Sequence, residues 1–326
     1  MTEKLLEAMQ IFAMIVLDYA LCIILHEMGH LCMGKVAGYE LISFRIGHIK
    51  ILRKNGKWAP AREHVPGTLG QCVMLPPETN EPEKMTAIPY HLGGGLFNLL
   101  TAAGAVPFYC LAGGKFGKSF FLILAVLSAA FALINLYPAK IITPNDGYNI
   151  RLALKNPDDR KAMYHMLQIL GCTEMSLGEM PESFFELCEN GEYSGTMKLM
   201  NAIRFLDLGD LEKAEELFRE VYADTQKTAP FYRMEAKKEM LFCMLLRKAP
   251  ADAVAEVYDD ELKKYLNDKH NRSAANLRVL CAYDHLISMN EEEAKAEYRE
   301  AMALLKNASA GDAKMERRLI NRINLL

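Results

Sequence analysis

Long apolar runs occur only in the first 150 residues of this 326-residue chain, and they are long enough to be membrane-spanning helices. Three stretches stand out, at about residues 5–36, 91–114 and 119–137. A helix needs roughly 20 apolar residues to cross a bilayer. The second stretch is rich in glycine and alanine, which allow a neighbouring helix to approach closely. The pattern predicts a membrane core of three helices; the alternative is that these stretches are buried helices of a soluble protein.

The segment between the first two apolar stretches, residues 40–77, has a different pattern. It contains short β-rich pieces, and the Asn-Gly pair at 55–56 is a strong hairpin signal. We therefore expect a small β-hairpin region in this connector.

Residues 151–326 read as one amphipathic helix after another. The stretches 197–225 and 277–305 each contain a helix, a short polar break and a second helix with an apolar stripe. Both stretches resemble tetratricopeptide-like helical hairpins, which stack and expose a concave surface. The expected architecture is mainly α: a membrane core at 1–150, followed by a soluble tetratricopeptide-like domain at 151–326. A plain helical bundle is the alternative. The second domain is expected to bind a protein partner or to regulate the core.

The distribution of basic residues predicts the orientation in the membrane. Lys and Arg concentrate in the connector, whereas the segment before the first span carries only Lys4. Such residues favour the cytoplasmic side. The sequence thus predicts a multi-pass protein of a bacterial cell membrane, with its N-terminus outside and its C-terminal domain cytoplasmic. The absence of a small-residue cleavage site after the first apolar run argues against a cleaved signal peptide.

Charge and cysteine content exclude several classes of protein. Residues 1–150 contain 12 Lys+Arg and 10 Asp+Glu, and the remainder contains 26 and 31. Neither part has the concentrated positive charge of a nucleic-acid-binding protein. The eight cysteines include no CxxC pair, which argues against a disulfide scaffold or a cysteine-zinc knuckle and is typical of a reducing compartment.

Candidate chemistry begins in the first apolar stretch, with the sequence HEMGH. His26 and His30 are four residues apart, so a helix places both imidazoles on one face, with Glu27 beside them. Two such histidines can bind one metal ion, and a neighbouring carboxylate can accept a proton from metal-bound water. Ionisable groups inside an apolar helix usually have a function. Two polar residues near a helix end are the structural alternative.

A third metal ligand is needed, and Asp146 is the candidate. It lies just after the third span in NLYPAKIITPNDGYN, a stretch interrupted by proline and glycine. An irregular backbone there could turn its carboxylate towards a cavity. Residues 144–147 would also form an ordinary turn, which is the alternative.

These motifs, in this order, resemble the site-2 protease family of intramembrane zinc metalloproteases. The resemblance rests on HEMGH, the glycine-rich second span with Asn98, and N-x-x-P with D-G after the third span, and it covers about residues 10–150. It implies that His26, His30 and Asp146 bind one Zn²⁺ ion. Glu27 would then be the catalytic base, and Asn98 a supporting polar residue.

The aspartate motif departs from the family pattern in two ways. Asn135 and Pro138 match its start, and Asn135 is implied to support the site. More residues than usual separate Pro138 from Asp146, however, and Asn145 stands where the family has an apolar residue.

The resemblance also implies how a substrate is held. β-Hairpin segments of the family lie near the site and are thought to bind the substrate in extended form. An added strand supplies backbone hydrogen bonds to an unwound peptide. The candidate edge here is 67–73, with Gly67 and Gly70 as candidate binding residues; a β-subdomain with no substrate role is the alternative.

The function expected from all of this is hydrolysis of peptide bonds within or near transmembrane segments of other membrane proteins, in contact with lipid. The alternative is a membrane-anchored helical-repeat scaffold with a non-catalytic core. His48, His64 and His91 are interpreted as non-ligands, the last at the membrane interface. Asp18 either lines a polar cavity or bonds to a neighbouring helix.

Overall fold

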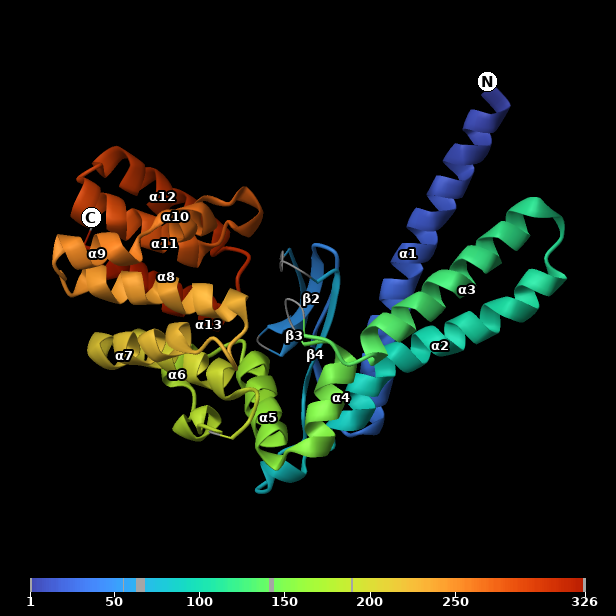
Figure 1. Ribbon diagram of the computed structural model, residues 1–326, viewed down its shortest axis with the longest axis horizontal. Helices are drawn as coiled ribbons and strands as arrows, with labels where there is room; N and C mark the ends of the chain where they lie inside the picture. Colours follow the sequence, from blue (N-terminus) through green and yellow to red (C-terminus); the bar gives the residue numbers. More distant parts are fainter. Residues whose placement is uncertain (1, 55, 63–67, 141–143, 189, 325–326) are drawn as a thin grey trace. The chain divides into compact units, whose positions relative to one another are not determined.

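The computed structural model describes residues 2–54, 56–62, 68–140, 144–188 and 190–324, and most of these residues are helical (Figure 1). The chain divides into two compact units, one made of residues 1–50 and 67–160 and the other of 51–66 and 161–326. The elements of the first part of the chain are α1 (Thr2–Val36), β1 (Glu40–Ile46), β2 (Ile49–Lys54), β3 (Lys57–Arg62), β4 (Gly70–Leu75), α2 (Ala87–Leu111), α3 (Gly114–Leu136) and α4 (Asp146–Lys155).

Three long helices form the core of the first unit. α2 and α3 make an antiparallel hairpin, and α1 packs beside it (Figure 1). The hairpin turns at Gly114, whose φ of +78° is in the left-handed region that favours glycine. The three helices meet at a small buried cluster, to which each contributes one residue: Cys22, Ala105 and Leu124.

The outer faces of these helices are apolar. Phe12, Leu100, Val126 and Leu133 are all more than half exposed. The segments Lys4–Val36, Pro82–Leu111 and Gly114–Leu136 are long and apolar enough to cross a membrane. Three candidate spans were expected. The second begins earlier than predicted and ends at Leu111, because Ala112 and Gly113 form the turn and α3 begins at Gly114.

The connector forms a four-stranded sheet in the order β3-β2-β1-β4. β1 and β4 pair antiparallel, with Phe44 opposite Cys72 and an irregularity between Leu41 and Ser43. β4 is therefore an edge strand within the described part of the chain. Gly56, after β2, has a φ of +73°, as a tight hairpin requires; Asn55, the other half of that turn signal, lies outside the described residues.

The second unit is a helical assembly around one large apolar core. α5 (Pro157–Gly171) contains the boundary between the units. The α-helices that follow it are α6 (Ser194–Leu208), α7 (Leu211–Ala223), α8 (Pro230–Leu246), α9 (Ala251–Val257), α10 (Asp260–Asn267), α11 (Ala274–Tyr283), α12 (Glu291–Leu304) and α13 (Ala310–Asn321). α8 contributes a continuous buried run from Ala236 to Leu245. A buried ion-pair network crosses this core: Arg278 bonds to Glu239 and Glu316 and stacks on Phe242.

The predicted helix pairs are present, but a tetratricopeptide repeat is not shown. α6 and α7 are joined at Gly209, in the left-handed region, and Asp210, whose side chain accepts from the Lys213 N–H. α11 and α12 are joined differently, through a π-helical turn at Asp284–Ser288.

Candidate metal centre

Two histidines from α1 and an aspartate from α4 converge at one point. The Nε2 atoms of His26 and His30 are 3.1 Å apart. Asp146 Oδ2 lies 3.2 Å from the first nitrogen and 3.3 Å from the second. All three side chains are largely buried. This group could hold a metal ion, and within the described residues it is the only such group of three or more.

The turn between α3 and α4 fixes the position of Asp146. The side-chain oxygen of Asn145 accepts hydrogen bonds from the backbone N–H groups of Tyr148 and Ala139. Its side-chain amide donates to the carbonyls of Ile134 and Tyr137. One residue thus caps the start of α4 and the end of α3. This explains why asparagine, rather than an apolar residue, precedes Asp146.

Glycines in α2 make room for the centre, and each of three consecutive ones meets a different neighbour. A Cβ at Gly93 would lie 2.3 Å from the carbonyl oxygen of Gly29, so α1 and α2 touch backbone to backbone. A Cβ at Gly94 would lie 2.5 Å from His26 Nε2 and 2.6 Å from His30 Nε2. A Cβ at Gly95 would meet Leu136 of α3.

Each of the three converging side chains also contacts a group on α2. His30 Nδ1 lies 2.7 Å from the carbonyl oxygen of Tyr90, which can accept its proton, and His30 Nε2 faces His26 and Asp146. The Asn98 amide lies 3.3 Å from His26 Nδ1. His91 Nδ1 lies 3.6 Å from Asp146 Oδ1.

Asp146 is the acidic member of the group. Burial opposes its ionisation, but the charge of His30 and hydrogen bonds from His26, His30 and His91 outweigh that effect. They hold the pKa of the Asp146 carboxyl well below its usual range. The carboxyl is therefore ionised, as a metal ligand must be.

A cavity of about 520 Å³ opens beside this group, and the first residues of β4 form part of its wall. Its lining includes Glu27, Gly70, Cys72, His91 and Asn135. The carboxylate of Glu27 lies against the strand: a Cβ on Gly70 would be 2.4 Å from Glu27 Oε1. Burial and the charge of Glu27 raise the pKa of the Cys72 thiol to about 12, so this cysteine stays protonated.

The other predicted support residues are divided between the cavity and the interior. Asn98 is fully buried beside His26. Asn135 lines the cavity, and its side-chain amide donates a hydrogen bond to the carbonyl of Phe131, one turn earlier in its own helix. Gly70 lines the cavity, whereas Gly67 lies outside the described residues.

His91 is the site residue that sequence reasoning did not find, since it was expected to be a non-ligand at the interface. It is buried and lines the cavity. The available signal was its spacing. Gly94 lies three residues and Asn98 seven residues after His91, which places all three on one face of a helix. His48 contributes nothing to the cavity lining, and His64 lies outside the described residues.

Asp18 belongs to the same stripe of α1. Asp18, Cys22, His26 and His30 follow one another at intervals of four residues. Asp18 is fully buried, and neither of its carboxylate oxygens has a hydrogen-bond partner among the residues described. Next along the stripe, Cys22 Sγ lies 3.2 Å from Ser128 Oγ of α3.

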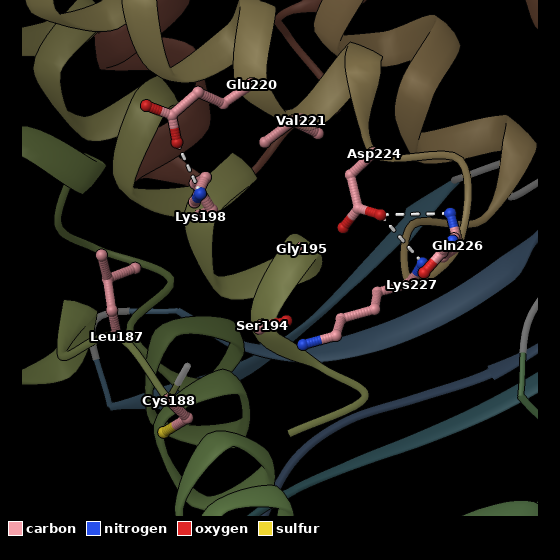
Figure 2. Close-up of a pocket in the computed structure, with 10 residues that line it drawn as sticks. All are labelled: Leu187, Cys188, Ser194, Gly195, Lys198, Glu220, Val221, Asp224, Gln226 and Lys227. Carbon is pink, nitrogen blue, oxygen red and sulfur yellow. Dashed lines mark hydrogen bonds and ion pairs between the residues drawn. The ribbon is translucent and has the colours of Figure 1, made fainter. Parts of the chain in front are cut away.

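A second cavity, of about 440 Å³, lies in the second unit (Figure 2). Leu187 and Val221 give it apolar walls, and Lys198, Glu220, Asp224 and Lys227 contribute charged groups. Lys198 pairs with Glu220 at 2.5 Å, and the carboxylate of Asp224 accepts from backbone N–H groups of the following turn.

Comparison with known proteins identifies no relative. No protein-family model, curated protein or solved structure matches the chain. The site is therefore interpreted from its own geometry.

Proposed function

We propose that this protein is an intramembrane zinc endopeptidase. The observation that carries the proposal is the convergence of His26 Nε2, His30 Nε2 and Asp146 Oδ2 next to the Glu27 carboxylate, within helices apolar enough to cross a membrane. Zinc bonds of 2.0–2.1 Å in a tetrahedral site place ligand atoms about 3.3 Å apart. The separations of 3.1, 3.2 and 3.3 Å in this group fit that ion.

Bound zinc would supply an activated water molecule and polarise the scissile carbonyl. Glu27, beside the ligands and facing the cavity, accepts the proton of the attacking water and passes it to the departing amine. Tyr90 and Asn98 keep the two imidazoles oriented. The Asn98 amide nitrogen faces His26 Nδ1. With Nε2 on a metal, Nδ1 would carry the proton, and an Asn98 amide turned by 180° would accept it through its oxygen.

The substrate is a transmembrane segment of another protein, bound in extended form along β4. Support comes from the position of this strand at the edge of the sheet and from its first residues, which line the cavity. A helix cannot be cleaved while its carbonyls are held in hydrogen bonds, and pairing with an edge strand replaces those bonds. The resemblance of residues 10–150 to the site-2 protease family supports the same reaction.

The proposed orientation places the N-terminus outside a bacterial cell membrane and the second unit in the cytoplasm, where its helices bind a protein partner. The basic connector supports this orientation. Single cysteines at the N-terminus and at Lys115, in a cysteine-free chain, would be labelled from outside by an impermeant reagent, and one at Lys269 would not. The reverse labelling pattern would exclude this topology.

Replacement of the proposed base tests the reaction. Glu27→Gln removes the proton acceptor but leaves both histidines and Asp146, so we expect about one zinc per chain and a loss of cleavage of roughly 10² to 10⁴-fold. Zinc is measured on the purified protein. Cleavage is measured by comparing membrane proteomes from cells that carry the wild type or the variant, and by looking for fragments cut within spans.

Two outcomes would reject the proposal. A variant that cleaves as well as the wild type excludes Glu27 as the base. A wild-type chain that retains no metal favours a membrane-anchored helical scaffold instead.

A further inference from the structure

The Asp146 carboxylate has two oxygens in different surroundings. Oδ2 is the oxygen that approaches the two histidine nitrogens, at 3.2 and 3.3 Å, whereas Oδ1 is the oxygen that approaches His91 Nδ1 of α2, at 3.6 Å. The cap of α4 does not need this carboxylate, because Asn145 already accepts from the Tyr148 N–H. The contact with His91 is therefore what distinguishes the two oxygens.

His91 is itself held in place. Its ring packs edge-on against Tyr90, with centroids 5.0 Å apart, and only about 8% of the residue is exposed. The side-chain amide nitrogen of Asn149, one turn after Asp146 on α4, lies 3.4 Å from the same Nδ1 atom. When Nδ1 donates to Asp146, this amide has to turn its oxygen, rather than its nitrogen, towards the ring. The imidazole thus joins the first turns of α2 and α4 at the metal group.

We infer that His91 is a positioning residue that donates a hydrogen bond to Asp146 Oδ1 and thereby directs Oδ2 alone to the metal. Groups that orient metal ligands in this way tune the affinity of a site, and their loss typically costs 10- to 100-fold. Tyr90 and Asn98 hold the two histidines from the same helix. With His91, α2 orients all three ligands.

The inference rests on the proposed metal centre and extends it. A carboxylate held through one oxygen binds a metal with the other and leaves one position of a tetrahedral ion open for water. A carboxylate without that restraint can bind through both oxygens and occupy the open position. His91 would thus control how many positions remain open for the reaction.

Metal titration of the full chain, purified in detergent, tests this role. His91→Phe keeps a flat ring but removes the donor, and His91→Asn retains an N–H donor. We expect His91→Phe to bind Zn²⁺ 10- to 100-fold more weakly in competition with a chelator, and His91→Asn to recover most of that loss. His270→Phe, at an exposed position of the second unit, is the matched control and should bind like the wild type.

Cobalt provides a readout that a merely structural role would not change. Co²⁺ absorbs visible light more strongly in four-coordinate than in five-coordinate sites, so its absorption should fall in His91→Phe and be restored in His91→Asn. Circular dichroism checks that each variant is folded. If His91→Phe unfolds, a wild-type spectrum and affinity in His91→Asn still support the donor role, and a changed spectrum opposes it.

The possible failures are distinguishable. A wild-type chain that binds neither Zn²⁺ nor Co²⁺ removes the metal centre itself, and with it the proposed function. A wild type that binds metal, beside a folded His91→Phe with unchanged affinity and cobalt spectrum, overturns the role of His91 alone. Equal losses in His91→Phe and His91→Asn also overturn it.

Discussion

Single residues decide whether the first unit can assemble its metal group, and glycine at position 94 is the sharpest case. The ligand nitrogens of both histidines lie where a Cβ on this residue would be. Glycine in a helix costs up to about 1 kcal/mol relative to alanine. At Gly94 that cost is outweighed by the space it leaves for two imidazoles.

Gly94→Ala should therefore abolish metal binding while leaving most of the fold intact. The added methyl group would approach the imidazole nitrogens to 2.5–2.6 Å, so the rings must rotate away from Asp146. We expect zinc content to fall from about one per chain towards zero, as measured by elemental analysis of the purified protein.

Gly104→Ala is the matched control on the same helix. A Cβ there meets nothing within 4 Å, so metal binding should be unchanged and stability should rise by about 0.5 to 1 kcal/mol. Full zinc occupancy in Gly94→Ala would show that these imidazoles do not bind the metal in the arrangement described.

At the scale of elements, the junction of α3 and α4 places the aspartate of the candidate metal group. Asp146 is the first residue of α4, and a Cβ on Gly147 would lie 2.1 Å from the carbonyl oxygen of Leu136 in α3. The two helices therefore meet backbone to backbone directly beside the aspartate. Asn145 closes this junction with four hydrogen bonds: three with α3 or the turn that follows it, and one with the first turn of α4.

Replacing that junction residue should loosen the metal group without removing a ligand. Loss of a helix cap costs about 0.5 to 2 kcal/mol. For Asn145→Ala we expect a lower midpoint of thermal unfolding and a zinc affinity reduced by roughly 10-fold, since Asp146 loses its fixed position. Chelator competition and circular dichroism measure the two effects.

Asn290→Ala separates the two consequences. Asn290 caps α12 of the second unit by accepting from the Glu293 N–H, so its loss should lower stability alone. If Asn145→Ala binds zinc as tightly as Asn290→Ala, the cap does not control the ligand.

At the scale of the whole molecule, a buried glutamate in the second unit links folding stability to pH. In the second unit, Glu297 of α12 is 6% exposed, and its Oε2 has no hydrogen-bond partner among the described residues. Burial, followed by the charges of Asp284 and Glu293, raises the pKa of Glu297 to about 8, although Arg272 opposes the shift. The ordinary pKa of a glutamate in an unfolded chain is about 4.3.

This difference predicts how the stability of the second unit depends on pH. Between about pH 4.3 and pH 8 the folded state holds a proton that the unfolded state has lost, so stability falls as the pH rises through this window. Above it both states are ionised and the contribution stops changing. Glu297→Gln should therefore flatten the decline in the thermal midpoint, followed by circular dichroism, between pH 5 and pH 8.

Parallel curves for wild type and Glu297→Gln would show that Glu297 is not the group responsible. Glu300→Gln is a suitable control, because its carboxylate is already paired with Arg272 on the surface, and hydrogen bonding to that arginine lowers its pKa. Its effect on the slope should be small, because the charge of Glu300 is the weakest of the effects that shift the pKa of Glu297.

The sequence by itself determined the features that depend on short-range pattern. Three apolar stretches predicted three candidate spans because the length of a hydrophobic run does not depend on its neighbours. The spacing of His26 and His30 placed their imidazoles on one face because the turn of a helix is fixed. The β-rich connector predicted a small β-hairpin region for a similar reason, whereas the pairing of β1 with β4 joins segments about 30 residues apart.

Only the tertiary structure decided what depends on contacts between distant parts of the chain. Asp146 lies 116 residues after His30, and the sequence of its turn did not show where its carboxylate lies. The Asn145 junction brings that carboxylate to the two histidine nitrogens. His91 had no ligand-spaced companion in sequence, yet α2 brings it to Asp146. The reason is physical: a metal group needs side chains fixed to within a few tenths of an ångström, and helix packing, here through Gly29 and Gly93, sets those distances.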